Sequence, residues 1–94
     1  MIQFNSNNLE DLHEEMNLRN TEISVEIIKG ICDALDQNIG SVLVAFAPEV
    51  ESGLEIFIEK PNFLEALEIN LDRCENAEEF ELCQRAIKWI EKLQ

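Results

Sequence analysis

The chain has 94 residues, the size of one domain, and 46% of them are hydrophobic, which is sufficient for a modest core. Twenty acidic residues against seven basic ones give a formal net charge of −13. This charge excludes direct binding to the phosphate backbone of DNA or RNA and to an anionic membrane surface, because both attract clustered cations. The expected organisation is a single acidic domain over residues 1–94.

The number of cysteines and the hydropathy of the sequence predict the cellular compartment of the protein. The three cysteines, Cys32, Cys74 and Cys83, are an odd number and do not form a disulfide framework. Buried free thiols in a reducing compartment are the expectation. No basic start followed by an apolar stretch is present, and no apolar run approaches the roughly 18 residues of a membrane helix. We therefore expect a soluble, cytoplasmic protein.

The first residues predict a short extended segment followed by a short helix. Ile2 and Phe4 alternate with polar residues, which indicates a short strand or an ordered tail. Asn8 is a suitable helix N-cap. The helix that follows it has one narrow apolar stripe, formed by Leu9, Leu12 and Met16.

The next segment allows two interpretations. Thr21 is a suitable helix cap and Gly40 a suitable end, and between them four apolar residues follow the helical period: Ile27, Ile28, Ile31 and Leu35. Strand-like alternation is also present, at Ile23, Val25 and Ile27. Gly30 inside a helix costs about 1 kcal/mol relative to Ala. Because the helical spacing continues past Gly30, we favour a helix.

Two strands and one ambiguous segment follow. Residues 41–47 are apolar on both faces, as in a covered strand, and residues 54–59 alternate clearly, with Pro48 and Gly53 marking the turn between them. Residues 63–73 fit a strand through Leu67, Ile69 and Leu71. They also fit a helix through Phe63, Leu64, Leu67 and Leu71. We favour a third strand, since three strands are more stable than a lone hairpin.

The C-terminal segment predicts an amphipathic helix capped by Asn76, with acids at its start and bases at its end, as the helix dipole prefers. One apolar stripe consists of Phe80, Cys83, Ile87 and Ile90. A second stripe, which is a candidate self-association surface, consists of Leu82, Ala86, Trp89 and Leu93. The predicted fold is an α+β domain of order α–α–β–β–β–α, with helices packed on one face of an antiparallel three-stranded meander.

Charge is the strongest functional signal. Residues 1–59 carry twelve acids and two bases, a net of −10. Four of these acids share one face of the predicted second helix and are the first candidates for partner binding: Glu22, Glu26, Asp33 and Asp36. The further candidates are Glu10, Asp11, Glu14, Glu15, Glu55 and Glu59.

Other chemistries have no matching pattern. The acids lack the spacing of a calcium-binding loop, and His13 with three scattered cysteines does not form a zinc site. A strongly negative field opposes a reactive thiolate, and no glycine-rich phosphate loop is present. We expect no enzyme activity, no catalytic residues, no cofactor and no metal.

A rigid array of carboxylates resembles a row of phosphates electrostatically and is steered onto basic grooves. In size and charge the chain resembles the small acidic phage proteins that block restriction or CRISPR complexes. The expected function is inhibition of a basic partner protein by occlusion of its nucleic-acid-binding surface. Two alternatives stay open: an immunity protein or antitoxin that caps a basic toxin or nuclease, and an adaptor that dimerises through its C-terminal helix.

Overall fold

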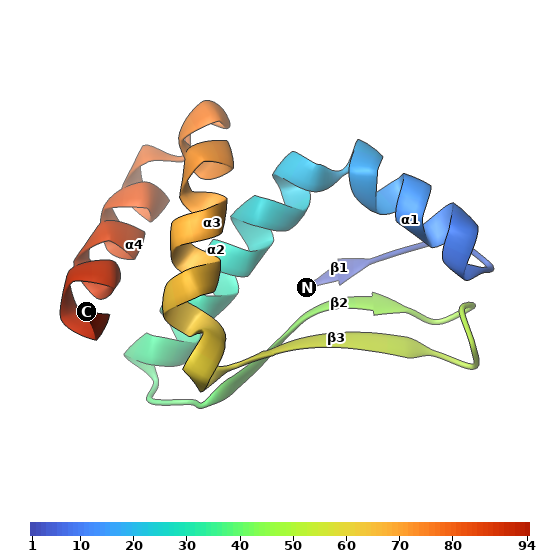
Figure 1. Ribbon diagram of the computed structural model, residues 1–94, viewed down its shortest axis with the longest axis horizontal. Coiled ribbons are helices and arrows are strands. Elements are labelled where there is room, and N and C mark those ends of the chain that lie inside the picture. The colour runs from blue at the N-terminus through green and yellow to red at the C-terminus, as the bar shows by residue number, and fades with distance from the viewer.

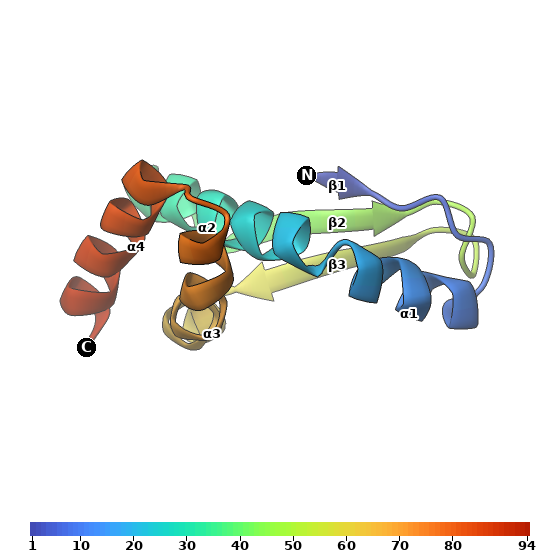
Figure 2. The same ribbon diagram turned by 90° about the horizontal axis from the view of Figure 1, so that it is seen from above.

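The computed structural model describes residues 1–94 and has the expected α+β class. In chain order the elements are β1 (Ile2–Gln3), α1 (Leu9–Leu18), α2 (Asn20–Asp36), β2 (Ser41–Ala47), β3 (Leu54–Glu59), a 3-10 turn (Lys60–Asn62), α3 (Phe63–Asn76) and α4 (Phe80–Leu93). Helices α1 and α2 lie over one face of the sheet, and α3 and α4 stack on α2 beyond one end of it (Figures 1 and 2).

The sheet is mixed, so the predicted antiparallel meander was wrong. The strand order is β1-β2-β3, with β1 parallel to β2 and β3 antiparallel to it. The third strand therefore comes from the N-terminal segment, where Ile2 pairs with Ala45. Val44 is an extra residue in β2, because the register shifts between Leu43 and Ala45. At this bulge two consecutive residues, Val44 and Ala45, are both buried.

Residues 63–73 form a helix, so the predicted strand was wrong and the observed order is β–α–α–β–β–α–α. The inward face of α3 consists of Phe63, Leu67, Asn70 and Cys74, which follow the helical period. The period was hidden because the polar Asn70 is buried, whereas the apolar Ile69 is exposed. Both residues occupy positions opposite to those that their hydropathy favours.

The helix ends agree only in part with the predicted caps. Asn8 caps α1, and its side-chain oxygen accepts a hydrogen bond of 2.9 Å from the backbone N–H of Asp11. The predicted caps Thr21 and Asn76 were wrong: α2 begins one residue before Thr21, and Asn76 is the last residue of α3. Neither α2 nor α4 has a side-chain cap hydrogen bond.

Helix α2 continues through Gly30, where it packs closely against β2. A Cβ atom at Gly30 would lie 3.0 Å from Cγ2 of Val42 in β2. The missing side chain lets the helix approach the sheet closely, which offsets the low helix propensity of glycine. The apolar spacing that continues past Gly30 was therefore the correct guide.

Two adjoining clusters form the core. The larger one lies between α2, α3 and α4 and includes Ile28, Ile31, Phe63 and Leu67. The smaller one lies between the sheet and α1, and it is centred on Phe4, Leu12, Val44 and Val50. Ile27, Val42 and Ile58 pack against both clusters and join them. None of the helices combines the length and apolar character required to cross a lipid bilayer.

Candidate functional site

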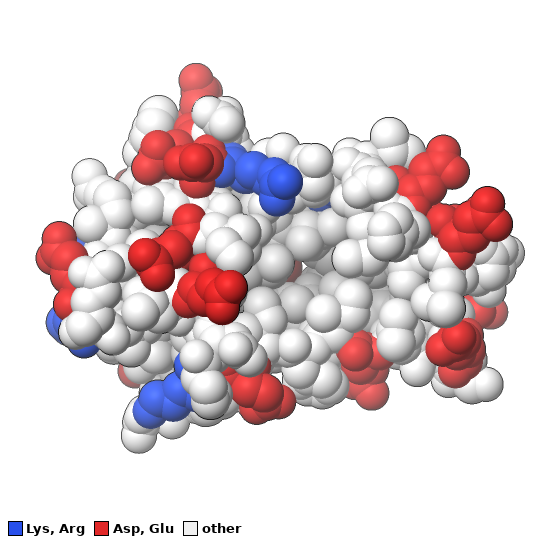
Figure 3. Space-filling model, viewed as in Figure 1, with Lys and Arg blue, Asp and Glu red and all other residues white.

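Acidic side chains form several separate groups on the visible surface. Figure 3 shows them over α3 and at the opposite end of the molecule, over α1 and the β2–β3 turn, with few basic side chains between. Five of the twenty acids form ion pairs within the chain: Glu15, Glu22, Glu26, Asp33 and Asp36. The other fifteen form none. The distribution of these unpaired carboxylates defines the surface available to a partner.

The four acids predicted along α2 are all engaged within the chain. Glu22 pairs with Arg19 at 2.8 Å, and Glu26 pairs with the N-terminal amine of Met1, which precedes β1. The other two carboxylates share one guanidinium of α4: Asp33 and Asp36 lie 2.9 and 2.8 Å from Nη2 of Arg85. These contacts partly neutralise the predicted row, so it does not present four free charges.

Trp89 completes the contact between α2 and α4. Its indole Nε1 donates a hydrogen bond of 3.0 Å to Asp36, and the ammonium of Lys92 lies 4.8 Å from the centre of its ring. Arg85 and Trp89 together hold the pKa of Asp36 below its usual value. Asp33 and Asp36 in turn raise the pKa of Arg85. This cluster fastens α4 to the C-terminal half of α2.

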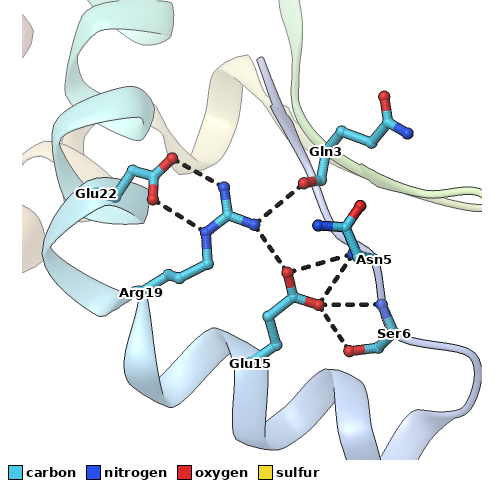
Figure 4. A network of polar contacts seen from close by, with 6 residues as sticks. All are labelled: Gln3, Asn5, Ser6, Glu15, Arg19 and Glu22. Atoms are coloured by element: carbon cyan, nitrogen blue, oxygen red, sulfur yellow. Dashed lines mark hydrogen bonds and ion pairs between the residues drawn. The ribbon is translucent and has the colours of Figure 1, made fainter.

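A second cluster fastens the N-terminal segment to the junction of α1 and α2 (Figure 4). Glu15 accepts hydrogen bonds from the backbone N–H groups of Asn5 and Ser6, at 3.0 and 3.1 Å, and from the Ser6 hydroxyl at 2.6 Å. Arg19 donates to Glu15 at 2.8 Å and to the carbonyl of Gln3 at 3.1 Å. These bonds hold β1 beside the helices.

The charges in this second cluster stabilise one another. The Ser6 hydroxyl and the Arg19 guanidinium hold the pKa of Glu15 below its usual value. The hydrogen bond from Arg19 likewise lowers the pKa of Glu22, and the two carboxylates raise the pKa of Arg19. Glu15 and Glu22 therefore have a structural role.

An array of unpaired carboxylates lies on α3 and was missed from the sequence. Four exposed carboxylates without ion pairs follow the outer face of this helix at positions i, i+3, i+7 and i+10: Glu65, Glu68, Asp72 and Glu75. We call them the α3 stripe. Because residues 63–73 were expected to be a strand, their acids were not placed on one face. The spacing of the acids themselves was the signal that indicated a helix.

The remaining predicted binding residues lie on α1 and β3. Glu10, Asp11 and Glu14 are exposed on α1 at the far end of a molecule 39 Å long. Glu55 and Glu59 are exposed on β3, where Glu59 accepts a hydrogen bond of 3.2 Å from the Ser41 hydroxyl. The predicted residues are thus divided among three regions of the surface.

The candidate self-association stripe of α4 faces the core. Ala86 is fully buried, and the other three members, Leu82, Trp89 and Leu93, are half-buried against the α2–α3–α4 cluster. The large apolar side chains that α4 exposes are instead Phe80 and Ile87. The stripe therefore contributes its area to the fold.

The potential nucleophiles are protected. All three cysteines are free and buried. Burial raises the pKa of Cys32 to about 11 and that of Cys74 to about 12. Both thiols stay protonated at neutral pH, and a protonated thiol is a weak nucleophile. His13 is exposed on α1, and no three His, Cys, Asp or Glu side chains converge closely enough to hold a metal ion.

Comparison with protein-family models, with curated proteins and with solved structures finds no match for this chain.

Proposed function

We propose that this chain is an acidic inhibitor that occludes a basic nucleic-acid-binding surface of a partner protein. The observation that carries the proposal is the α3 stripe, four exposed carboxylates with no ion pair along one rigid helix face. A helix rises about 1.5 Å per residue, so the stripe has one charge every ~5 Å. One strand of DNA has one charge every ~3.4 Å.

The internal ion pairs change which face we assign to the partner. A carboxylate that already has a cation gains less from a second one, and releasing it costs the first pair. The α2 acids are therefore secondary, and the α3 stripe is the first candidate. The exposed acids of α1 and of the β2–β3 turn add to the long-range field that steers a basic partner.

A matched pair of triple variants tests which face makes the contact. The stripe variant is Glu68→Gln, Asp72→Asn and Glu75→Gln; the control, Glu10→Gln, Glu14→Gln and Glu51→Gln, removes the same charge at the far end. Exposed ion pairs contribute about 0.2–1 kcal/mol each, so the stripe variant should weaken binding by roughly 3- to 150-fold. The control should weaken it much less.

The binding assay starts from nuclease-treated lysate passed over the immobilised chain. Duplex DNA or RNA, added at constant ionic strength, should release a captured basic protein, and the affinity of that purified protein should fall steeply with salt. Equal weakening by both triple variants would show that the acids act through the overall charge and that the α3 stripe is not the contact face. A partner that nucleic acid does not displace would favour the capping of a toxin or nuclease instead.

A further inference from the structure

A groove between β3 and α3 lies beside the acidic stripe. Its volume is about 270 Å³, and it is lined by Phe57, Ile58, Asn62, Glu65, Ala66, Ile69 and Asn70. Two large apolar side chains from different elements are more than half exposed there, Phe57 at 52% and Ile69 at 62%. Figure 3 shows uncharged surface next to the acidic side chains over α3. The groove thus combines an apolar lining with an acidic margin.

One wall of the groove is the free edge of the sheet. β3 is an edge strand, since only β2 pairs with it. At the end of this ladder the N–H of Lys60 donates to the carbonyl of Gly40 at 2.8 Å. Main-chain groups alternate in direction along a strand, so those of Glu55, Phe57 and Glu59 point away from β2. The bulge does not disturb this order, because the extra residue belongs to β2. The edge therefore offers unpaired donors and acceptors to an added strand.

The charges beside Phe57 decide what kind of strand fits. Glu55 and Glu59 lie on the same side of β3 as Phe57, and Glu65 lies in the opposite wall. No Lys or Arg lines the groove. A second copy that paired antiparallel about Phe57 would place Glu55 opposite Glu59 twice, and like charges in such pairs are destabilising. A strand with Lys or Arg at these two positions gains opposite-charge pairs instead.

We propose that this groove binds an extended basic segment of a partner protein. The segment adds as a strand to the free edge of β3 and seats one apolar side chain between Phe57 and Ile69. Main-chain hydrogen bonds supply affinity in this mode of recognition, and alternate side chains supply specificity. The groove shares Glu65 with the α3 stripe, but this proposal goes beyond the function proposed above, because the groove recognises a strand and needs no nucleic-acid-binding surface.

The test uses a defined peptide, Thr-Lys-Thr-Val-Thr-Lys-Thr, titrated into the isotope-labelled protein at low salt and followed by NMR. With its valine opposite Phe57, the two lysines face Glu55 and Glu59. We expect shift changes centred on β3 and α3, and slower hydrogen exchange at the N–H groups of Phe57 and Glu59. No binding, or shift changes confined to α1 and the β2–β3 turn, would overturn the proposal.

Two N-methylated peptides separate strand addition from simple charge attraction. The N–H of the valine faces β3 and that of the next threonine faces away. A methyl group on the valine nitrogen should therefore weaken binding at least tenfold, whereas the same group on the threonine should have little effect. Equal affinity of the two peptides would overturn strand addition. Neither peptide assay involves nucleic acid, so its failure is distinct from failure of the inhibitor function.

Protein variants test the apolar wall. Ile69→Gln replaces an exposed apolar side chain of the groove with a polar one and should lower the affinity for the peptide roughly 3- to 10-fold. Ile87→Gln makes the same change on the exposed face of α4 and is the matched control. The NMR spectrum reports directly that each variant is folded. Unchanged affinity of Ile69→Gln, or a dimer in sedimentation that the peptide does not dissociate, would contradict the assignment.

Discussion

The buried hydrogen bond between α2 and α3 offers a quantitative test of the packing. The hydroxyl of Ser24 donates to Oδ1 of Asn70 at 2.8 Å, and Nδ2 of Asn70 donates to the carbonyl of Ala66 at 2.7 Å. Ser24 is 1% exposed and Asn70 is 8% exposed. If one of the two residues is replaced by an apolar one, the other becomes a buried polar group without its main partner.

The expected free energies follow from this burial. Ser24→Ala leaves the Asn70 oxygen without its donor, and Asn70→Leu leaves the serine hydroxyl without its acceptor. Leaving one buried group unsatisfied costs about 1–3 kcal/mol. The double variant Ser24→Ala/Asn70→Leu removes both polar groups and fills the space, so we expect it to lose less than about 1 kcal/mol. The coupling between the two sites is then at least ~1 kcal/mol.

Urea unfolding, followed by the fluorescence of Trp89 and by far-ultraviolet circular dichroism, measures all four proteins. Thermal unfolding gives a second measure, because in a domain of this size a loss of 1 kcal/mol lowers Tm by about 4–8 °C. The slope of the unfolding free energy against urea should stay constant, since the same surface is exposed on unfolding. If the two single losses add to within ~0.5 kcal/mol in the double variant, the argument from a shared buried bond is refuted.

Three further predictions concern packing, acid stability and thiol reactivity. Gly30→Ala should destabilise the protein by about 1 kcal/mol in urea unfolding, because overpacking against Val42 outweighs the gain in helix propensity. In a Val42→Ala background the same Gly30→Ala change should stabilise the protein, because the overpacking is removed and the gain in helix propensity remains. The folded pKa of Glu15 lies below its unfolded value of about 4.3, so its stabilisation is present above pH ~5 and is lost as the pH falls through the folded pKa. The stability advantage over Glu15→Gln should therefore shrink between pH 5 and pH 3 in urea titrations; a constant difference would contradict this. With the pKa values of Cys32 and Cys74 raised by burial, a thiol reagent at pH 8 should label the native protein only at its unfolding rate, and rapid labelling of either cysteine would refute their burial.

Local patterns were a sufficient guide where burial agrees with hydropathy. In α2 the inward positions Ile28 and Ile31 are apolar, so the helical period was visible in spite of Gly30. In β3 every second residue is exposed, and two of these three are acidic, so the strand was predicted correctly although the third, Phe57, is apolar. The N-cap at Asn8 depends on residues three positions apart and was also correct.

Helix α3 shows why the same approach was wrong elsewhere. Asn70 is tolerated inside because Ser24, 46 residues away, supplies a hydrogen bond, and Ile69 stays outside at the margin of a groove. Neither fact is encoded in the local spacing. The argument that a hairpin needs a third strand was sound, but β1 supplied that strand by parallel pairing from the other end of the chain.

The proposed binding surface likewise depends partly on composition and partly on packing. The net charge and the acidic character of the surface follow from composition, because they are sums over residues that do not depend on the fold. Which carboxylates stay free depends on cations brought from far along the chain: Arg85 reaches Asp33 across 52 residues, and the N-terminal amine reaches Glu26 across 25. Long-range pairing of this kind is a product of packing. It engages the acids of α2 in ion pairs and leaves the acids of α3 unpaired.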